Sequence, residues 1–413
     1  MRLSIRLNSK TLYLLTLWGY IIVSGLHVIQ NKLAGASTYI LAGLAIILLT
    51  YTILPKKRIS FSRSVNSFRT GILICFILMS FSSLFNLLIG TDGYELGYVI
   101  IDCLAMMILY VGPCYVDDSI DENFEKWIFF LGGIACIIGL YAMILSNFRI
   151  SNINERATNT LHLQYYLWKL MECWPFLLIN LILRFDKAKR YPMRMVITAV
   201  LFLEYVILSL LFMKRMVFFD MLVVIVVSVL SYRANFIKLL RRALLPALIV
   251  FVLFLIGKRL FSFDVNNILQ LTLNRFDNGE TISEFDRLTE FFDLFDQFGY
   301  RFLIAGMGIG SSHSRAGGVN LHMGLLNFIF KGGIPLFLLI ILQMLKAIRV
   351  LLSRIDTSEK FYAACVIYTL IRSIISPFWV PNPTRILFSI ALGMTLYKYD
   401  EIKERIAYDS NYT

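Results

Sequence analysis

The sequence has few charged residues, and this shortage excludes most kinds of water-soluble protein. Charged residues make up 16% of its 413 positions and hydrophobic residues 58%, and the mean hydropathy is +0.71. Soluble domains contain about half apolar residues. The formal charge of +13 comes from short clusters between apolar runs. Such clusters are typical of membrane loops, so we expect no nucleic-acid partner.

Cysteine and the common catalytic motifs are also scarce or missing. The six cysteines all lie within or beside apolar runs, which indicates small buried side chains rather than a disulfide framework or a zinc site. The sequence contains no Walker loop, no Asp-x-Asp pair, no HExxH and no Gly-x-Ser-x-Gly. ATP hydrolysis and metal-dependent sugar transfer are therefore disfavoured, and we expect neither a cofactor nor a metal.

Long apolar runs are what the sequence does have. About 20 apolar residues cross a bilayer as a helix. The first run follows Arg2, Arg6 and Lys10 and is too long for a signal peptide, so it is predicted to be an uncleaved first span. The sequence predicts twelve spans, at 11–29, 34–54, 70–90, 98–115, 127–147, 165–183, 195–213, 216–230, 244–261, 324–345, 361–377 and 385–398.

The distribution of lysine and arginine predicts the orientation of these spans. With the N-terminus inside, 25 of the 40 basic residues fall in inside segments, 12 in outside segments and three within apolar runs. Cytoplasmic loops carry the excess of basic residues. Both termini are therefore predicted to be cytoplasmic, in one integral-membrane domain covering 1–413. The long loop 258–323, between spans nine and ten, is predicted to lie outside.

This loop contains a predicted amphipathic helix at 283–299. Its apolar residues recur at helical spacing, Thr281 and Glu284 form a capping-box pattern, and Gly299 suits the C-terminal end. We expect the helix to lie on the membrane or to pack on the helical bundle.

Four basic residues and one histidine are candidates for chemistry. Arg287 and His322 could form an anion site with a proton acceptor, or could be a surface arginine and a helix-start histidine. Lys214 and Arg215 interrupt an apolar stretch. They could occupy a tight turn at the outer face, or could be interfacial anchors that snorkel. The fourth basic residue, Arg315, lies in the long loop 258–323.

Glycines and isolated acids are the other polar features. Gly306, Gly308 and Gly310 lack dinucleotide-binding spacing and context, so we expect a flexible turn whose N–H groups a ligand can approach. Asp102, Glu204 and Asp220 lie in apolar runs and are expected to be structural hydrogen-bond partners or, alternatively, proton relays, whereas Glu172 lies three residues after Lys169 and is expected to pair with it.

Several of these residues together resemble the O-antigen polymerase and ligase superfamily. The resemblance covers roughly 197–337 and rests on Arg215, Arg287, the run FLIAGMGIG at 302–310, the run LHMGLLN at 321–327 and the run GGIPL at 332–336. Met323 follows His322 where the family commonly has asparagine, and Lys214 and Met216 flank Arg215 where it has serine and glycine.

The resemblance implies an all-α, GT-C-like membrane protein with about twelve spans and one long periplasmic loop. It implies a metal-independent, inverting glycosyltransferase of the bacterial inner membrane that uses an undecaprenyl-pyrophosphate-linked oligosaccharide. Arg215, Arg287 and His322 would be catalytic. We assign substrate binding to Lys214, Arg301, Arg315, Gly306, Gly308 and Gly310. A chain-length regulator and a flippase would be partners, besides the bilayer itself.

Three functions fit this resemblance or the hydropathy. The first is a polymerase of O-antigen or capsule, which joins lipid-linked repeat units. The second is an O-antigen ligase, which transfers a finished glycan to lipid A-core. The third is a transporter or flippase for lipid-linked oligosaccharides. The arginines concentrate on one face instead of lining a path through many spans, which favours transfer over transport.

Overall fold

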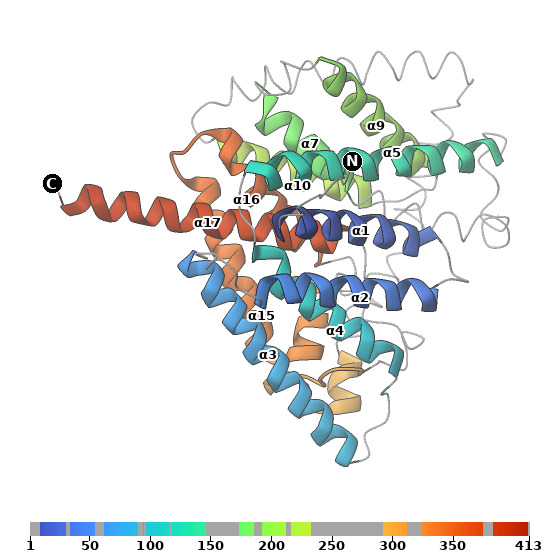
Figure 1. Cartoon of the computed structure of the whole chain (residues 1–413), viewed down its shortest axis with the longest axis vertical. Coiled ribbons are helices and arrows are strands. Elements are labelled where there is room, and N and C mark those ends of the chain that lie inside the picture. The colour runs from blue at the N-terminus through green and yellow to red at the C-terminus, as the bar shows by residue number, and fades with distance from the viewer. Residues whose placement is uncertain are drawn as a thin grey trace, which may run out of the picture. The chain divides into compact units, whose positions relative to one another are not determined.

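The structure, a computed structural model, describes most of the chain in separate stretches (Figure 1). The described residues are 9–29, 34–53, 62–89, 94, 96–114, 118–145, 173–185, 192–211, 216–232, 292–311, 324–374 and 383–411. Across these residues the regular structure is helical, apart from an isolated bridge between Tyr94 and Ser311. The expected all-α class is confirmed for this part of the chain.

The helices follow the predicted spans closely. They are α1 (Ser9–Ile29), α2 (Ala34–Ile53), α3 (Arg63–Leu88), α4 (Leu96–Val111), η2 (Gly112–Cys114), α5 (Asp118–Leu145), α7 (Trp174–Leu183), α9 (Pro192–Leu211), α10 (Met216–Tyr232), α14 (Arg301–Ile304), α15 (Gly324–Leu352), η5 (Thr357–Lys360), α16 (Phe361–Arg372) and α17 (Pro383–Asn411). Every predicted span overlaps one of these helices except 244–261, which lies outside the described residues.

The lengths and composition of the apolar helices are compatible with a membrane protein. Three described helices, Arg63–Leu88, Gly97–Cys114 and Gly324–Leu352, are long and apolar enough to cross a bilayer, and shorter apolar helices accompany them. One side of α3 is apolar and uncovered, with Phe81, Leu84 and Phe85 each more than half exposed. Soluble proteins rarely expose large contiguous apolar patches, whereas the lipid of a bilayer would cover an apolar helix face. Twelve as the number of spans stays a prediction.

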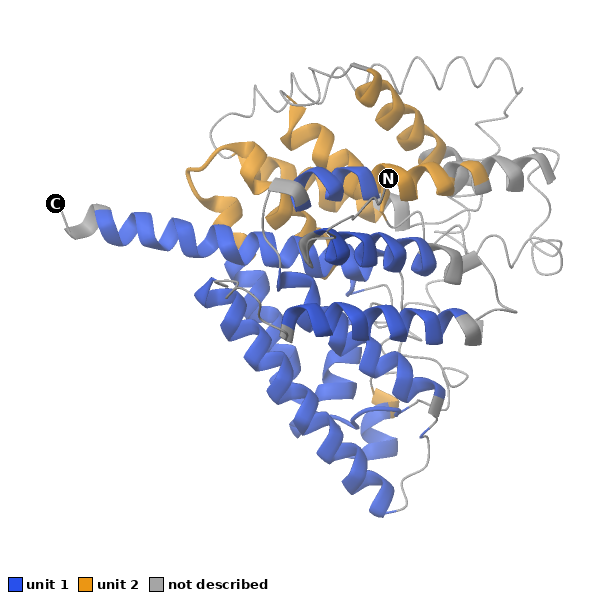
Figure 2. Cartoon of the chain, viewed as in Figure 1, with its two compact units in different colours: residues 1–127, 294–346, 373–413 blue, residues 128–293, 347–372 orange. Residues whose placement is uncertain are grey.

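The chain divides into two compact units, which Figure 2 colours separately. Unit 1 comprises residues 1–127, 294–346 and 373–413, and unit 2 comprises residues 128–293 and 347–372. In unit 1, α1 packs on α2 and α2 on α4, while α17 packs against α3, α4 and η2. Glycine permits the close approach of α17 to η2, because a Cβ at Gly393 would lie 2.6 Å from the Cα of Pro113.

One end of unit 1 joins α3 to α17. Ser64 in the first turn of α3 donates its N–H and its hydroxyl to the Asp400 carboxylate of α17, at 2.7 and 2.6 Å. The first N–H groups of a helix have no partner within the helix. A carboxylate there satisfies one of them and opposes the positive end of the helix dipole. The bond therefore fixes the start of α3 against α17.

In unit 2, α7, α9, α10 and α16 pack together. Lys360 donates to the carbonyl of Ser231 at the C-terminal end of α10, at 2.9 Å, and Arg184 follows the last residue of α7. Arg184 donates to the Ser358 carbonyl and lies over the ring of Phe361. Cations at helix C-termini oppose the negative end of the dipole, so both stabilise the same end of this unit.

Candidate functional site

The site in unit 1 begins with a break in α15. Gly333 has φ 67° and ψ −168°, which is not helical, and Pro335 follows two residues later. Proline has no N–H, and its ring clashes with the carbonyl four residues earlier. That carbonyl belongs to Lys331. The break therefore leaves the carbonyls of Phe330 and Lys331 without their usual helical donors.

The glycine turn at 306–310 supplies the missing donors. The N–H of Met307 donates to the Phe330 carbonyl at 2.6 Å, and the N–H of Gly308 donates to the Lys331 carbonyl at 2.9 Å. The two backbones touch, because a Cβ at Gly306 would overlap the Lys331 carbonyl oxygen and one at Gly333 would lie 2.6 Å from the Ile304 oxygen. Glycine is required at these positions for the approach itself.

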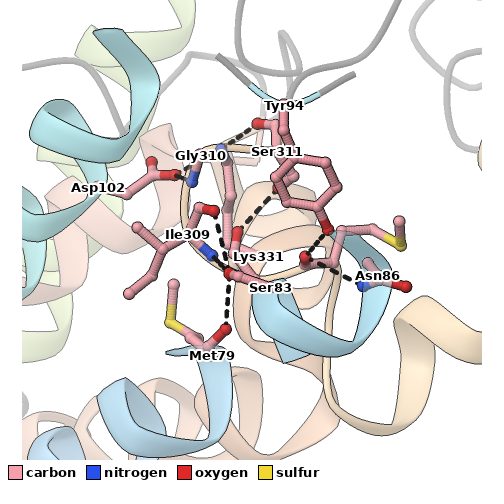
Figure 3. Close-up of polar contacts among 11 residues, drawn as sticks. Met79, Ser83, Asn86, Tyr94, Asp102, Ile309, Gly310, Ser311 and Lys331 are labelled. Atoms are coloured by element: carbon pink, nitrogen blue, oxygen red, sulfur yellow. Dashed lines mark hydrogen bonds and ion pairs between the residues drawn. The ribbon is translucent and has the colours of Figure 1, made fainter. Parts of the chain in front are cut away.

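Polar side chains of α3 hold the other side of the turn (Figure 3). Ser83 Oγ accepts the N–H of Ile309 at 2.6 Å and lies 2.8 Å from the Met79 carbonyl, to which it can donate its one proton. Asn86 Nδ2 donates to the Met307 carbonyl at 3.3 Å. The side chains of Ser83 and Asn86 thus replace hydrogen bonds that water would give to an exposed turn.

A buried ion pair closes the turn at its far end. Lys331 Nζ lies 2.8 Å from Asp102 Oδ2 of α4, and both side chains have no exposed surface. The same Oδ2 accepts the N–H of Gly310 at 2.8 Å. Lys331 Nζ also donates to the carbonyl of Ser311. One charged pair therefore joins α4, α15 and the end of the turn.

Tyr94 covers the turn from the connection between α3 and α4. Its hydroxyl donates to the Met307 carbonyl at 2.5 Å, and the residue bridges to Ser311. Burial raises the pKa of the Tyr94 phenol to about 12, which the hydrogen bond with Asn86 opposes only in part. The neutral phenol is thus the form that the folded protein stabilises.

These bonds change the interpretation of the three glycines. The N–H groups of Gly306, Gly308 and Gly310 donate to Phe302, Lys331 and Asp102 respectively. The sequence-based expectation was a flexible turn with N–H groups open to a ligand. The turn is instead buried and hydrogen-bonded to the protein, because it completes a broken helix. Through these bonds the three glycines fix the backbone of the turn.

The remaining predicted site residues lie mostly outside the described residues. Arg301 is described and is exposed at the start of α14, directly before the turn. The structure does not describe Lys214, Arg215, Arg287, Arg315 or His322. Its described residues nevertheless fix both flanks of the stretch that contains Arg315 and His322. Ser311 is held by Lys331, and the N–H of Leu325 donates to the Ser373 carbonyl at 3.0 Å.

The end of the predicted amphipathic helix is described at residues 292–298. Gly299 has φ 61°, and its N–H donates to the Phe295 carbonyl at 2.8 Å, so it ends the helix as predicted. The ring of Phe295 lies 5.0 Å from that of Phe302, and Phe298 lies 5.9 Å from Phe330 of α15. Of the two expected placements, packing on the bundle is the one seen for residues 294–298.

Sequence reasoning missed the acid–base pairing that organises both units. Lys331 is one of the three basic residues that the sequence places within apolar runs, and its partner Asp102 was not identified there. In unit 2, Asp220 accepts the hydroxyls of Tyr205 at 2.6 Å and Tyr368 at 2.8 Å, and Arg372 lies 3.6 Å away. The available signal was that two apolar runs contain a lone acid, Asp102 or Asp220, and two others contain a lone base, Lys331 or Arg372.

Comparison with known proteins gives no relative: no family model, no curated protein and no solved structure matches the chain.

Proposed function

We propose that the protein is a polysaccharide polymerase of the bacterial inner membrane. It joins undecaprenyl-pyrophosphate-linked oligosaccharide repeat units of O-antigen or capsule at the periplasmic face. In this proposal the chain crosses the membrane twelve times, both termini are cytoplasmic, and the loop 258–323 is periplasmic. Undecaprenyl pyrophosphate leaves after each transfer.

The observation that carries the proposal is the fixed glycine turn on the broken helix. Four groups of contacts, from α3, α4, α15 and Tyr94, hold residues 306–311. The stretch 312–323, with Arg315 and His322, follows directly and ends where α15 begins at Gly324. Catalysis needs groups held on a rigid support. A turn with this many internal bonds is such a support for the residues next to it.

The two ends of unit 1 support the proposed orientation. The turn lies against the C-terminal half of α3 and the N-terminal halves of α4 and α15. The opposite ends of α3 and α15 carry Arg63 and Lys346, and the end of α17 beside them carries Lys398 and Lys403. Basic residues favour the cytoplasmic side. This distribution of basic residues supports a periplasmic position for the turn.

The proposed chemistry needs cations and one base. The bond between the donor sugar's anomeric carbon and its pyrophosphate oxygen breaks, and the acceptor hydroxyl oxygen forms the new bond to that carbon. Arg215 and Arg287 offset the negative charge that develops on the departing pyrophosphate. His322 accepts the hydroxyl proton. Lys214, Arg301 and Arg315 would bind anionic parts of the substrate.

A reconstituted assay tests the proposal. The purified protein in nanodiscs is supplied with a lipid-linked repeat unit, and the products are separated by length. We expect a ladder of polymers with the wild type. Arg215→Ala, Arg287→Ala and His322→Ala should give no ladder at normal protein levels, and Arg→Lys should restore it only in part, because lysine lacks the bidentate fork.

Deletion of the gene separates the polymerase from the ligase. Loss of a polymerase leaves single repeat units on the surface acceptor, since transfer to the acceptor is intact while elongation fails. Loss of a ligase instead leaves full-length polymer on the lipid carrier and none on the acceptor. The second pattern, or a ladder from Arg287→Ala equal to that of the wild type, would overturn the proposal.

A further inference from the structure

The glycine turn is held inside the ends of the helices that surround it in unit 1. Ser83 of α3, Asp102 of α4 and Lys331 of α15 bind its backbone, and these three helices are the ones long and apolar enough to cross a bilayer among the described residues. Counted from the nearer end of each helix, the three residues lie five, six and seven positions inside. With a rise of about 1.5 Å per residue, the turn lies about 8–11 Å within the helices.

The exposed surface of these helices is hydrophobic at the level of the turn. On α3 the exposed residues between 63 and 70 are polar, and those between 73 and 88 are all hydrophobic. The turn contacts α3 at Met79, Ser83 and Asn86, within the second of these ranges. On α15 the exposed residues begin at Ile334 and are hydrophobic up to Leu345. A bilayer that covers these faces therefore reaches the level of the turn.

The backbone of the turn has the hydrogen bonds that such a depth requires. All five N–H groups of residues 306–310 donate to other groups of the protein. The carbonyls of residues 306, 307 and 308 accept from side chains, namely Ser82, Asn86 with Tyr94, and Ser311. Irregular backbone is tolerated at membrane depth only where the protein satisfies it or where it lines a water-filled cavity. A turn surrounded by water would not need this many bonds from the protein.

The segment that leads into the turn exposes hydrophobic side chains of its own. Tyr300 and Ile304 are each 75% exposed, although Phe302 between them is fully buried. The carbonyl of Ile304 lies against Gly333, directly before the point where the exposed hydrophobic residues of α15 begin. Tyr300 and the exposed Arg301 lie about one helical turn earlier. Tyrosine is enriched at the boundary between membrane and water, and arginine can reach that boundary from below.

We propose that residues 300–311 form a re-entrant segment whose exposed face binds membrane lipid. The segment enters one leaflet at Tyr300, holds the glycine turn at the depth of the acyl chains, and returns at Ser311, which bridges to Tyr94 in the connection after α3. The acyl chains of that leaflet contact Ile304, and Tyr300 and Arg301 lie at the headgroups. The inference does not depend on the proposed reaction. A substrate carried on a lipid can reach a segment at this depth by diffusing within the leaflet.

The first test detects the lipid directly. The photoreactive residue p-benzoylphenylalanine replaces Ile304, Leu84 or Glu404, one at a time, in the full chain in phospholipid nanodiscs. Leu84 is exposed on the hydrophobic face of α3, and Glu404 is exposed on the charged end of α17. After irradiation, the mass of the intact protein shows the fraction that carries a phospholipid. We expect similar fractions at 304 and 84, several-fold above that at 404. A fraction at 304 no higher than at 404, or no phospholipid at 84, would overturn the proposal.

The second test compares two exposed isoleucines. Ile304→Asp places a charge among acyl chains, which is costly, whereas Ile406→Asp changes a residue that is 64% exposed on the charged end of α17. We expect a several-fold smaller amount of folded protein from membranes with Ile304→Asp and an unchanged amount with Ile406→Asp, since surface changes in water usually cost little stability. Equal amounts from the two variants would place Ile304 in water and overturn the proposal. If the wild type forms no polymer, the proposed function fails, while both measurements still decide the depth of the segment.

Discussion

Lys331 and Asp102 are 229 positions apart in the chain, yet Nζ and Oδ2 of these residues lie 2.8 Å apart with no exposed surface on either side chain. A pair buried this deeply is held by more than its own attraction. Asp102 also accepts from Gly310, and Lys331 also donates to Ser311. Removing charged groups from water costs free energy, and these extra hydrogen bonds offset part of that cost.

Removing one member of the pair should destabilise unit 1 strongly. Lys331→Met is expected to lower the free energy of unfolding by about 3–5 kcal/mol, because it leaves a buried carboxylate without its cation. Adding Asp102→Asn should recover part of this loss, since the neutral amide oxygen can still accept from Gly310. Thermal unfolding in detergent micelles measures both. A double variant less stable than Lys331→Met would contradict the argument.

The Lys398–Glu401 pair of α17 is the matched control. Its N–O distance is 2.6 Å, which is shorter than that of the buried pair, but both side chains reach solvent. Exposed pairs contribute about 1 kcal/mol at most. Lys398→Met should therefore change stability little despite the shorter distance.

The glycine turn gives a second prediction, which compares the space available for a Cβ at two glycines. Gly308 has φ +88°, and a Cβ there would lie 2.5 Å from the Met79 carbonyl and overlap Ser83 Oγ. Gly299 has φ +61° with nothing within 4 Å of such a Cβ. Gly308→Ala should cost about 2–5 kcal/mol, from backbone strain plus overpacking, and Gly299→Ala about 1–2 kcal/mol from strain alone. Equal losses would mean that the turn moves away from α3 at no cost.

Tyr94 gives a prediction about pH. Its folded pKa is about 12, above the usual value near 10, so its neutral form is favoured by folding. The stability from this group is complete below about pH 10 and is lost as pH rises towards 12. The spectroscopic titration of the wild type minus that of Tyr94→Phe should show one phenol that ionises near pH 12. If the phenol in this difference titration ionised near pH 10, burial of the Tyr94 hydroxyl against Met307 would be contradicted.

The orientation of the chain can be tested with single cysteines. Ser312→Cys and Asn278→Cys should react with a membrane-impermeant thiol reagent in intact spheroplasts. Arg190→Cys, in a connection predicted to be cytoplasmic, should react only after permeabilisation. The reverse pattern would place the glycine turn on the cytoplasmic side and remove the proposed access to periplasmic substrates.

Hydropathy predicted where helices occur better than where they begin. α3 begins at Arg63 and α5 at Asp118, whereas the predicted spans began at 70 and 127. The apolar run marks the part of a helix that lipid or protein covers. Helix ends depend on hydrogen bonds, such as that from the Val65 N–H to the Ser62 side chain. Polar first turns therefore lie outside any prediction based on hydropathy.

The contacts of the site were less predictable than the helices. The three glycines were recognised, but a glycine at positive φ fits both a mobile turn and a close approach of two backbones. Only the broken helix at Gly333 and Pro335 decides between them, since it provides the carbonyls that the turn completes. The pairing of Asp102 with Lys331 has no local signal, because nothing in the sequence around either residue specifies the other.

The separation of Asp102 from Lys331 also sets an order of events during biosynthesis. A ribosome that adds about 5–20 residues each second needs roughly 10–50 s to make the chain between them. During that time α4 must stay in or near the membrane without Lys331, and the insertion machinery must tolerate a carboxyl group in an apolar helix. The glycine turn, completed late, can dock only after this wait. Nascent chains stopped before residue 331 should consequently be far more open to membrane proteases than chains stopped after α15.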